Sequence, residues 1–251
     1  MRPHAPVGHE GAGIVEAVGA DVKTLVPGDH VLLSFAYCGT CQQCKSYQPA
    51  YCDTWIERNF GRIRQGHEKA TPGCKLETDG TQVWAGFFGQ SSFSKLALVG
   101  ETSCVKVEPS TDLAALAPLG CGLQTGAGAI FNRLRPIPSS SLLIIGVGAV
   151  GMGALFAAVA CGVQEVIVVD IHDSRLALAE SLGATRTINA MNNPDLVSAI
   201  RAATSSGQGP MYAVECTGRP ASLCDAFQSR CKRGTLVSCG TPGPGHNAPI
   251  E

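Results

Sequence analysis

The stretch LLIIGVGAVG, residues Leu142 to Gly151, decides the fold of the second half of this chain. It begins as a short apolar run and ends in the pattern G-x-G-x-x-G, directly before an alanine-rich segment. This order predicts a buried strand, a tight glycine turn and a helix. The first glycine allows the sharp turn, the second lets a pyrophosphate approach the backbone, and the third lets helix pack on strand. We therefore predict that a dinucleotide binds at Gly146, Gly148, Val150 and Gly151.

A second predicted strand, residues 165–170, ends in an acidic residue that suits the same site. Asp170 lies 19 residues after Gly151, near the offset of about 20 expected for an acid that binds the adenosine ribose 2′-hydroxyl. A carboxylate there would repel the 2′-phosphate of NADP, and no arginine directly follows Asp170. The pattern therefore favours NAD over NADP. The alternative interpretation is a structural glycine turn with an acid at this distance by chance.

Beyond Asp170, apolar strand candidates alternate with helix candidates. The strands are expected at residues 185–189, 212–215 and 235–239. The helices are expected at residues 173–182, 194–203 and 220–232. Alternation of this kind is typical of an α/β fold with a parallel, doubly wound sheet.

The first half of the chain has a different pattern. Between Val7 and Val107, apolar runs alternate with turn residues, and strands are expected at residues 13–18, 31–35 and 96–99. This pattern predicts antiparallel β structure. A cysteine-rich lobe and a charged, glycine-rich segment at residues 57–80 interrupt it as insertions. We therefore expect a β domain at residues 1–124 and a dinucleotide-binding domain at residues 125–251.

Composition limits the function classes. Lysine and arginine total 19 against 20 acidic residues, and the net charge of -1 supplies no basic surface for nucleic acid. The longest apolar stretch, residues 142–161, contains four glycines and is interpreted as a buried strand and helix instead of a membrane span. No signal peptide opens the sequence. Twelve cysteines in a chain long enough to fold without disulfides favour a reducing cytoplasm.

Four of the twelve cysteines lie close together in the sequence. Cys38, Cys41, Cys44 and Cys52 have the spacing C-x2-C-x2-C-x7-C, and four thiolates at such spacing can close a tetrahedral zinc site. This site has no open coordination position, so we predict that it braces a lobe of the fold without touching substrate. Seven further cysteines are interpreted as core residues or inert thiols, namely Cys74, Cys104, Cys161, Cys216, Cys224, Cys231 and Cys239.

Two further motifs complete the pattern. His9 and Glu10 open the segment G-H-E-x2-G-x5-G-x2-V, and the segment G-C-G-x2-T-G at residues 120–126 follows the predicted β structure. Together with the four-cysteine lobe and the glycine fingerprint, in this order, these motifs make the chain resemble the zinc-containing medium-chain alcohol dehydrogenases. The resemblance covers essentially the whole chain. It implies a GroES-like β domain and a doubly wound Rossmann domain, both incomplete.

The resemblance implies a second zinc site, with a catalytic role. His9 and Cys121 would hold this zinc, and Glu10 would lie beside them. Zinc would act as a Lewis acid in hydride transfer between a primary or secondary alcohol and NAD, interconverting the alcohol and its aldehyde or ketone.

Further site residues follow from the same resemblance. It implies that Thr125 contacts the nicotinamide and that Arg175 lies near the adenosine ribose. The segment GFFGQSSF, residues 86–93, is similar to family members that act on aryl or benzylic alcohols. Phe87 and Phe88 would line the substrate pocket, although two phenylalanines in a strand are more often core residues.

The chain departs from the family pattern at both ends. Only eight residues precede His9, whereas the family places a third zinc ligand and a proton-relaying serine or threonine upstream of this motif. We therefore expect the catalytic zinc to keep two of its three usual protein ligands. His67 and Cys74 could in principle substitute for the third, but nothing about their loop position favours this. The chain stops after the turn at residues 240–243. The contacts that form homo-oligomers in the family are expected to be lost with the missing segment.

Three interpretations stay open. The first is a shortened form of a zinc- and NAD-dependent alcohol dehydrogenase that acts on small alcohol or carbonyl substrates. The second is a truncated, catalytically impaired protein that still binds zinc and NAD. The third is a zinc-braced interaction protein with no nucleotide role, which the intact glycine fingerprint and Asp170 argue against.

Overall fold

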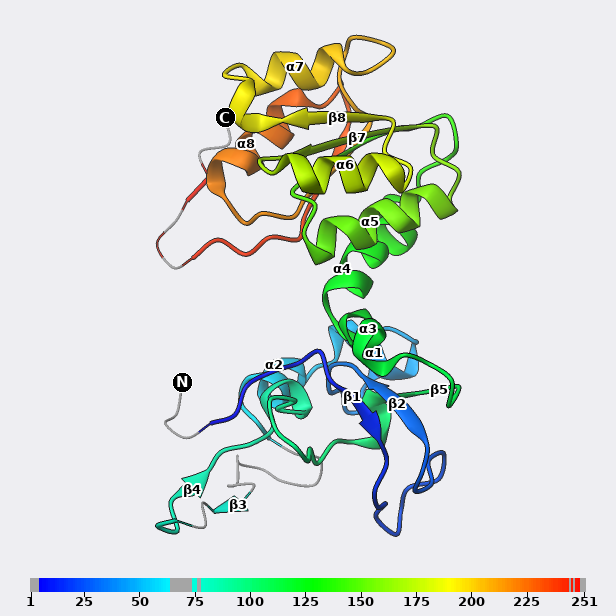
Figure 1. Ribbon diagram of the computed structural model, residues 1–251, viewed down its shortest axis with the longest axis vertical. Helices are drawn as coiled ribbons and strands as arrows, with labels where there is room; N and C mark the ends of the chain where they lie inside the picture. The colour runs from blue at the N-terminus through cyan, green and yellow to red at the C-terminus, as the bar shows by residue number, and fades with distance from the viewer. Residues whose placement is uncertain (1–4, 64–73, 76–77, 244, 246, 249–251) are drawn as a thin grey trace. The chain divides into compact units, whose positions relative to one another are not determined.

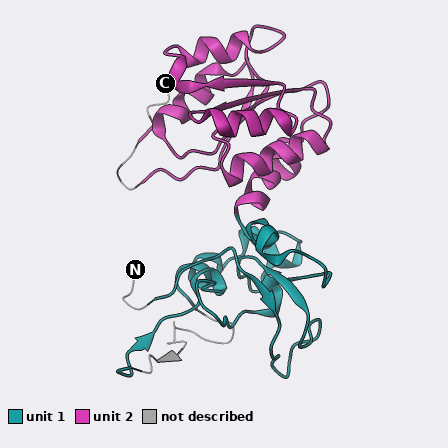
Figure 2. Cartoon of the chain, viewed as in Figure 1, with its two compact units in different colours: residues 1–121 teal, residues 122–251 magenta. Residues whose placement is uncertain are grey.

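The chain forms two compact units, shown in a computed structural model (Figures 1 and 2). The structure describes residues 5–63, 74–75, 78–243, 245 and 247–248. Unit 1 comprises Met1–Cys121 and unit 2 comprises Gly122–Glu251. The division lies three residues before the predicted domain boundary at residues 124/125, because helix α4 begins at Gly122 and belongs wholly to unit 2.

Unit 2 is built on a five-stranded parallel sheet with the order β10-β9-β6-β7-β8. This is the Rossmann order, in which β6 is the first strand and β9 follows on its other side. The predicted parallel, doubly wound sheet is therefore confirmed. The strands are β6 (Ser141–Ile145), β7 (Glu165–Asp170), β8 (Arg186–Asn189), β9 (Tyr212–Glu215) and β10 (Thr235–Ser238).

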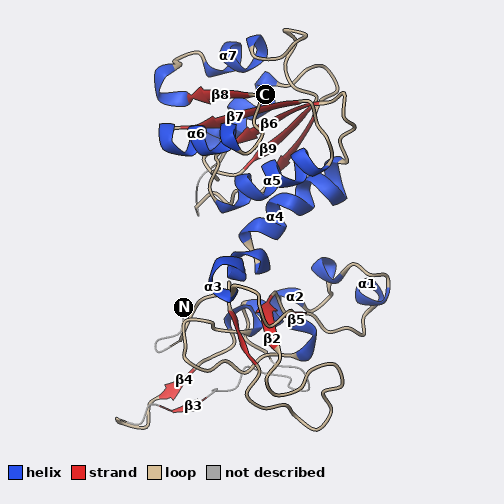
Figure 3. Cartoon of the chain, turned by 45° about the vertical axis from the view of Figure 1, so that its right-hand side comes forward, coloured by secondary structure: helices blue, strands red, loops and turns tan. Residues whose placement is uncertain are grey.

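Helices cover both faces of this sheet (Figure 3). Alternate residues of β6 point to opposite faces, so Leu142 and Ile144 pack with α5 and α6, whereas Leu143 and Ile145 pack with α7 and α8. Each buried Leu or Ile contributes about 1.5–3 kcal/mol to folding. The helices are α4 (Gly122–Gly128), α5 (Ala149–Ala160), α6 (Asp173–Ser181), α7 (Leu196–Ala202) and α8 (Pro220–Ser229), with a π-helical segment at Ala129–Leu134 and a 3-10 turn at Ala190–Asn192.

The predicted helices of unit 2 are present, but one of them ends clearly earlier in the sequence than expected. α8 ends at Ser229, three residues before the predicted residue 232, because Arg230 adopts an extended backbone with ψ 152°. The Arg230 guanidinium turns back and donates to the Phe227 carbonyl at 3.1 Å, which satisfies a carbonyl of the last turn.

Unit 1 contains a small antiparallel sheet with the order β1-β2-β5, as the alternating pattern predicted. Its strands are β1 (Ala12–Ile14), β2 (His30–Leu33) and β5 (Cys104–Val107), and a separate hairpin joins β3 (Cys74–Lys75) to β4 (Gln82–Val83). A small core of Leu25, Val31 and Leu33 lies on one face of this sheet. The helical segments are α1 (Gln42–Lys45), α2 (Trp55–Asn59), α3 (Leu113–Leu116) and the 3-10 turns η1 (Pro49–Tyr51), η2 (Phe87–Gly89), η3 (Glu101–Ser103) and η4 (Ala117–Gly120).

Two predictions for unit 1 are wrong. Residues 96–99 form no strand. Leu96 and Leu98 are 70% and 68% exposed, and of this run Val99 alone packs against the small core of unit 1. Phe87 and Phe88 lie in the turn η2 instead of a strand, because Gly86 and Phe88 both adopt positive φ values and reverse the chain there. Residues 64–73 and 76–77 of the predicted insertion lie outside the described residues.

Candidate metal centres and dinucleotide site

The four predicted zinc ligands of unit 1 come together. The sulfur atoms of Cys38, Cys41, Cys44 and Cys52 all lie within 4.8 Å of one another. Four thiolates bound at 2.3 Å in a tetrahedron would lie about 3.8 Å apart, and the Sγ atoms of Cys38 and Cys44 are 3.8 Å apart. The cluster therefore fits one zinc ion with little movement of the chain.

Backbone amides already favour a thiolate in this cluster. The amides of Thr40 and Cys41 donate to the Cys38 sulfur at 3.4 and 3.2 Å. Burial opposes ionisation of Cys38, but these hydrogen bonds outweigh it and lower the thiol pKa to about 5. Burial and a hydrogen bond with Cys41 raise the pKa of Cys44 to about 12. A bound zinc would displace the remaining protons, so its affinity depends on pH.

The lobe around this cluster has little other support. α1 is a single turn without a buried residue, and Tyr47 and Tyr51 are 95% and 70% exposed. The lobe thus lacks an apolar core of its own. With four sulfurs as ligands, a zinc here would have no open position and would act as a cross-link.

His9 lies on a chain segment that is held from several sides. Gly8 adopts φ +93°, and a Cβ there would lie 2.6 Å from the Phe93 amide, so the motif needs glycine before the histidine. The amides of Ser92 and Phe93 donate to the carbonyls of Gly8 and Val7 at 3.0 and 2.9 Å. The segment that carries His9 is therefore paired along its length with residues just after η2.

Gln90 is a residue that positions the His9 segment and that the sequence reasoning missed. Its side chain is buried, and its Oε1 accepts from the Gly11 amide at 3.1 Å. Its Nε2 donates to the His9 carbonyl at 3.0 Å and to the Ser34 carbonyl at 3.2 Å. One amide side chain therefore fixes the backbone on both sides of Glu10 and ties it to the end of β2.

Cys121 and Glu10 lie near one another in unit 1. Burial and then the Glu10 charge raise the pKa of the Cys121 thiol. Gly120 places this cysteine, because a Cβ at residue 120 would lie 1.9 Å from the Leu33 carbonyl oxygen of β2. Within the described residues, however, the four-cysteine cluster is the sole group of three or more possible metal ligands. His67 lies outside the described residues, as does the side chain of Cys74.

An aromatic cluster surrounds the His9 ring. Phe88 and Phe87 lie 4.5 and 5.8 Å from the imidazole between ring centroids. Trp55 and Phe60 of the α2 region extend the cluster, at 5.7 and 5.2 Å from Phe88. The sequence reasoning found Phe87 and Phe88 but missed the other two, because their position depends on how α2 packs. The cluster offers a flat π surface beside the imidazole.

A second buried amide positions this aromatic cluster. Asn59 Oδ1 accepts from the Ala36 amide at 2.9 Å. Its Nδ2 donates to the carbonyls of Ala36 and Trp55 at 2.9 and 2.8 Å. Asn59 thus fixes α2 to the chain that leaves β2, and Trp55 with it.

In unit 2, the three glycines of the fingerprint have three different surroundings. Gly146 adopts φ +86°, and a Cβ there would lie 2.6 Å from Thr217 Cγ2. Gly148 is exposed and has open space where a Cβ would be, so a ligand can approach its backbone. A Cβ on Gly151 would lie 1.9 Å from the Gly146 carbonyl oxygen, so only glycine lets α5 start this close to β6. Val150 is half-buried in the first turn of α5.

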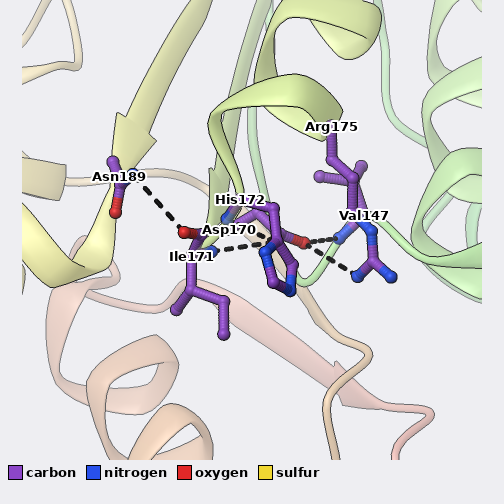
Figure 4. Close-up of polar contacts among 6 residues, drawn as sticks. All are labelled: Val147, Asp170, Ile171, His172, Arg175 and Asn189. Carbon is purple, nitrogen blue, oxygen red and sulfur yellow. Dashed lines mark hydrogen bonds and ion pairs between the residues drawn. The ribbon is translucent and has the colours of Figure 1, made fainter.

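Asp170 ties the end of β7 to the glycine turn (Figure 4). Its carboxylate is buried and accepts from the Val147 amide at 2.8 Å through Oδ2. Oδ1 accepts from the amides of Ile171 and His172 at 2.8 and 3.0 Å. Arg175 lies 3.9 Å from Oδ2, with its side chain half-exposed. The structure thus gives Asp170 a role in holding the turn, besides the predicted role at the ribose.

Thr125 lies on α4, which packs against α5. A Cβ on Gly126 would lie 1.8 Å from the Val150 carbonyl oxygen, so the glycine after Thr125 is needed for this close helix contact. Thr125 itself is exposed within unit 2. Its predicted contact with the nicotinamide stays a prediction.

The edge of the sheet beside the glycine turn holds further polar residues that sequence reasoning missed. Glu215 is buried at the end of β9 and accepts from the Thr217 amide at 2.7 Å and from the Gly218 amide at 3.1 Å. Cys216 follows it, and Cys239 follows β10. The only sequence signal was their position after apolar strands.

Family models match most of the chain. Residues 1–109 match the alcohol dehydrogenase GroES-like domain, and residues 149–251 match the zinc-binding dehydrogenase domain. These matches confirm the predicted pair of a GroES-like and a Rossmann domain.

Individual relatives agree with the family models. The chain is 43% identical to geraniol dehydrogenase of Castellaniella defragrans over 97% of this chain and 63% of that protein. It is 41% identical to a probable alcohol dehydrogenase of a Pseudomonas species over 95% of this chain and 73% of the relative. The crystal structure of benzyl alcohol dehydrogenase from Acinetobacter calcoaceticus superposes with a TM-score of 0.85 at 42% identity, covering 98% of this chain and 65% of that chain.

The chain belongs to the zinc-binding alcohol dehydrogenase family. The predicted family resemblance is therefore confirmed, as are zinc and a nicotinamide dinucleotide as the cofactors to which these domains and the cysteine cluster point. The chain spans about 63% of the length of the geraniol dehydrogenase that it matches.

In the part of the chain that the structure describes, no single helix is long and apolar enough to cross a membrane. The segments Leu113–Gly120 and Gly122–Leu134 reach the required length and composition only when they are taken together as a broken pair.

Proposed function

We propose that this chain is a zinc- and NAD-dependent alcohol dehydrogenase that interconverts an alcohol and its aldehyde or ketone. The observation that carries the proposal is the glycine turn with Asp170 in unit 2. Unit 1 of the same chain also contains His9, Glu10 and Cys121. When bound, zinc supplies a Lewis acid for the alcohol oxygen and the nicotinamide exchanges a hydride with the carbinol carbon. All other contributions come from side chains and backbone groups of this chain.

The protein groups divide into those that hold the dinucleotide and those that hold the substrate end. The exposed backbone at Gly148 and the start of α5 would bind the pyrophosphate. Asp170 would accept from the ribose hydroxyls, and its buried charge would disfavour a 2′-phosphate, so NAD is preferred over NADP. Arg175 would lie beside the adenosine ribose, and Thr125 would contact the nicotinamide.

At the substrate end, His9 and Cys121 would hold the catalytic zinc, with Glu10 close to both. Gln90 would keep the His9 backbone in place. The aromatic cluster of Trp55, Phe60, Phe87 and Phe88 favours substrates with a flat π system next to the carbinol carbon, such as aryl or allylic alcohols. The names of the geraniol and benzyl alcohol dehydrogenases among the relatives support this substrate class.

The second candidate function is an NAD- and zinc-binding protein without turnover. It is favoured by one observation, namely that among the described residues His9, Glu10 and Cys121 do not come together as a group of three possible metal ligands. This candidate keeps the structural zinc of the four-cysteine cluster and the dinucleotide site. It predicts one zinc ion per chain, whereas the dehydrogenase predicts two.

Three measurements separate the two candidates. Metal analysis counts zinc per chain, fluorescence titration measures NADH binding, and absorbance follows NADH formation from NAD with benzyl alcohol or geraniol. Cys121→Ala should remove one zinc and all turnover, whereas the matched control Cys104→Ala should change neither. Turnover that survives Cys121→Ala would contradict the proposed zinc site, and NADH binding without any turnover would favour the second candidate.

We further propose that the partners of this chain are small alcohol and carbonyl molecules and that it works in a reducing cytoplasm. The support is its cysteine content together with a net charge of -1. A thiol count under denaturing conditions on protein prepared without reductant tests the compartment, since disulfide-linked cysteines would contradict it.

A further inference from the structure

Cys216 and Cys239 lie side by side at the carboxyl edge of the parallel sheet in unit 2. β9 and β10 pair in register up to Glu215 and Ser238, so the next residues on the two strands are Cys216 and Cys239. The pairing continues to this point, because the Cys239 amide donates to the Glu215 carbonyl at 2.8 Å. Neighbouring strands lie about 4.8 Å apart, within the Cα separation of about 4.4–6.8 Å that disulfides span.

The two side chains share one face of the sheet. Both pack against the same core cluster, the one that includes Ile144 and Val214, and both are half-buried. A hydrogen bond between the two sulfurs raises the pKa of Cys216 and lowers the pKa of Cys239. The two sulfurs are therefore close enough for one thiol to attack the other once that other thiol is oxidised.

The loops that carry these cysteines also support the glycine turn. The methyl group of Thr217, directly after Cys216, fills the space where a Cβ of Gly146 would be. The Glu215 carboxylate accepts from the amides of Thr217 and Gly218. A Cβ on Gly240, directly after Cys239, would lie 2.0 Å from the Gly218 amide nitrogen. Any change in the Cys216–Cys239 separation must therefore move backbone that touches the dinucleotide turn.

We propose that Cys216 and Cys239 form a reversible oxidation site whose disulfide weakens dinucleotide binding. The oxidant class is a peroxide. The thiolate of one of the two cysteines attacks one peroxide oxygen of hydrogen peroxide, which gives a sulfenic acid and hydroxide. The thiol of the other cysteine then attacks the sulfenic sulfur, and the S–S bond forms with release of water, so one peroxide is reduced as two thiols are oxidised.

Closure of the bond would push the ends of β9 and β10 apart. Cα atoms joined by a disulfide usually lie about 5.5–6 Å apart, wider than the strand spacing of about 4.8 Å. Thr217 and Gly218 would move with Cys216, and the contact at Gly146 would shift. Loss of one hydrogen bond between the turn and a charged pyrophosphate weakens binding by about tenfold.

The direct test is peptide analysis of the full chain after treatment with hydrogen peroxide. Trypsin should release peptides 202–230 and 234–251, because proline follows Arg219. We expect these peptides to be joined after oxidation and separated by dithiothreitol. Cys224 lies in the first peptide, so Cys224→Ser should keep the link, whereas Cys216→Ser and Cys239→Ser should abolish it. Peptides that stay unlinked in the oxidised wild-type chain, or a link that survives Cys216→Ser, would overturn the oxidation site.

A second measurement tests the consequence for binding. The Kd for NADH should rise about tenfold on oxidation and recover with dithiothreitol, while Cys239→Ser should keep its affinity under peroxide. An unchanged wild-type Kd despite a complete link would overturn the coupling to the turn. The proposal rests partly on the proposed dinucleotide function, and the two can fail separately. A reduced chain that does not bind NADH would contradict that function and the coupling, whereas the peptide link reports on the cysteine pair alone.

Discussion

Replacing Gln90 with methionine should destabilise unit 1 strongly. Methionine has a similar length but cannot make the three hydrogen bonds to Gly11, His9 and Ser34. The Gly11 amide is buried and would lose its partner at a cost of about 2 kcal/mol, and the two half-buried carbonyls would add about 1 kcal/mol each. We therefore expect the free energy of unfolding to fall by about 4 kcal/mol.

The chain offers a clean probe for this measurement. Its two tryptophans, Trp55 and Trp84, both belong to unit 1, so tryptophan fluorescence during urea unfolding follows that unit without a contribution from unit 2. The matched control is Gln82→Met, because Gln82 is exposed on β4 and its replacement should change stability by less than about 0.5 kcal/mol. A loss below about 1 kcal/mol for Gln90→Met would refute the role of Gln90 as a buried clamp.

Three further predictions concern other parts of the chain. Asp170→Ser should reduce the preference for NADH over NADPH, because the carboxylate repels a 2′-phosphate, and it should weaken the binding of both coenzymes, because the carboxylate also holds the Val147 amide. Fluorescence titration with each coenzyme measures the two Kd values, and an unchanged ratio of these values would contradict the prediction. Cys44→Ser should remove one zinc per chain and destabilise unit 1 without changing NADH affinity. A loss of NADH affinity that accompanies the loss of stability would contradict the independence of the two units. Gly126→Ala should destabilise unit 2 by more than about 3 kcal/mol, because the new Cβ would lie 1.8 Å from the Val150 carbonyl oxygen. In the control Gly128→Ala the new Cβ would lie 3.6 Å from its nearest neighbour, so this change should be nearly neutral. Thermal unfolding followed by circular dichroism measures both effects.

The dinucleotide half of the fold could be predicted from sequence because its signals are local. The two central strands β6 and β7 contain unbroken apolar runs at residues 142–145 and 166–169. The helices α5, α6, α7 and α8 each start at or directly after a glycine, an acidic residue or a proline. Burial on both faces of a parallel sheet imposes this pattern. The cysteine cluster was predictable for the same reason, since its four residues lie within one short segment.

The substrate end of unit 1 was less predictable. Gln90 contacts Gly11 across 79 residues, and no local pattern distinguishes it from an exposed glutamine. The apolar run at residues 96–99 forms no strand, since Leu96 and Leu98 stay exposed and Val99 alone packs against the core. Trp55 and Phe60 reach Phe88 only because Asn59 fixes α2 to the chain after β2. Such residues acquire their roles from tertiary contacts, which a single sequence does not display.

The hydrogen bonds of Asp170 have a consequence for how this protein meets its coenzyme. The carboxylate holds the Val147 amide through a hydrogen bond within the protein itself, so the conformation of the glycine turn is fixed by the protein's own groups. Little conformational entropy then remains to be lost on association, which favours tight and rapid capture of the coenzyme. The same rigidity makes affinity sensitive to distant changes that loosen β7, even where no coenzyme atom is touched.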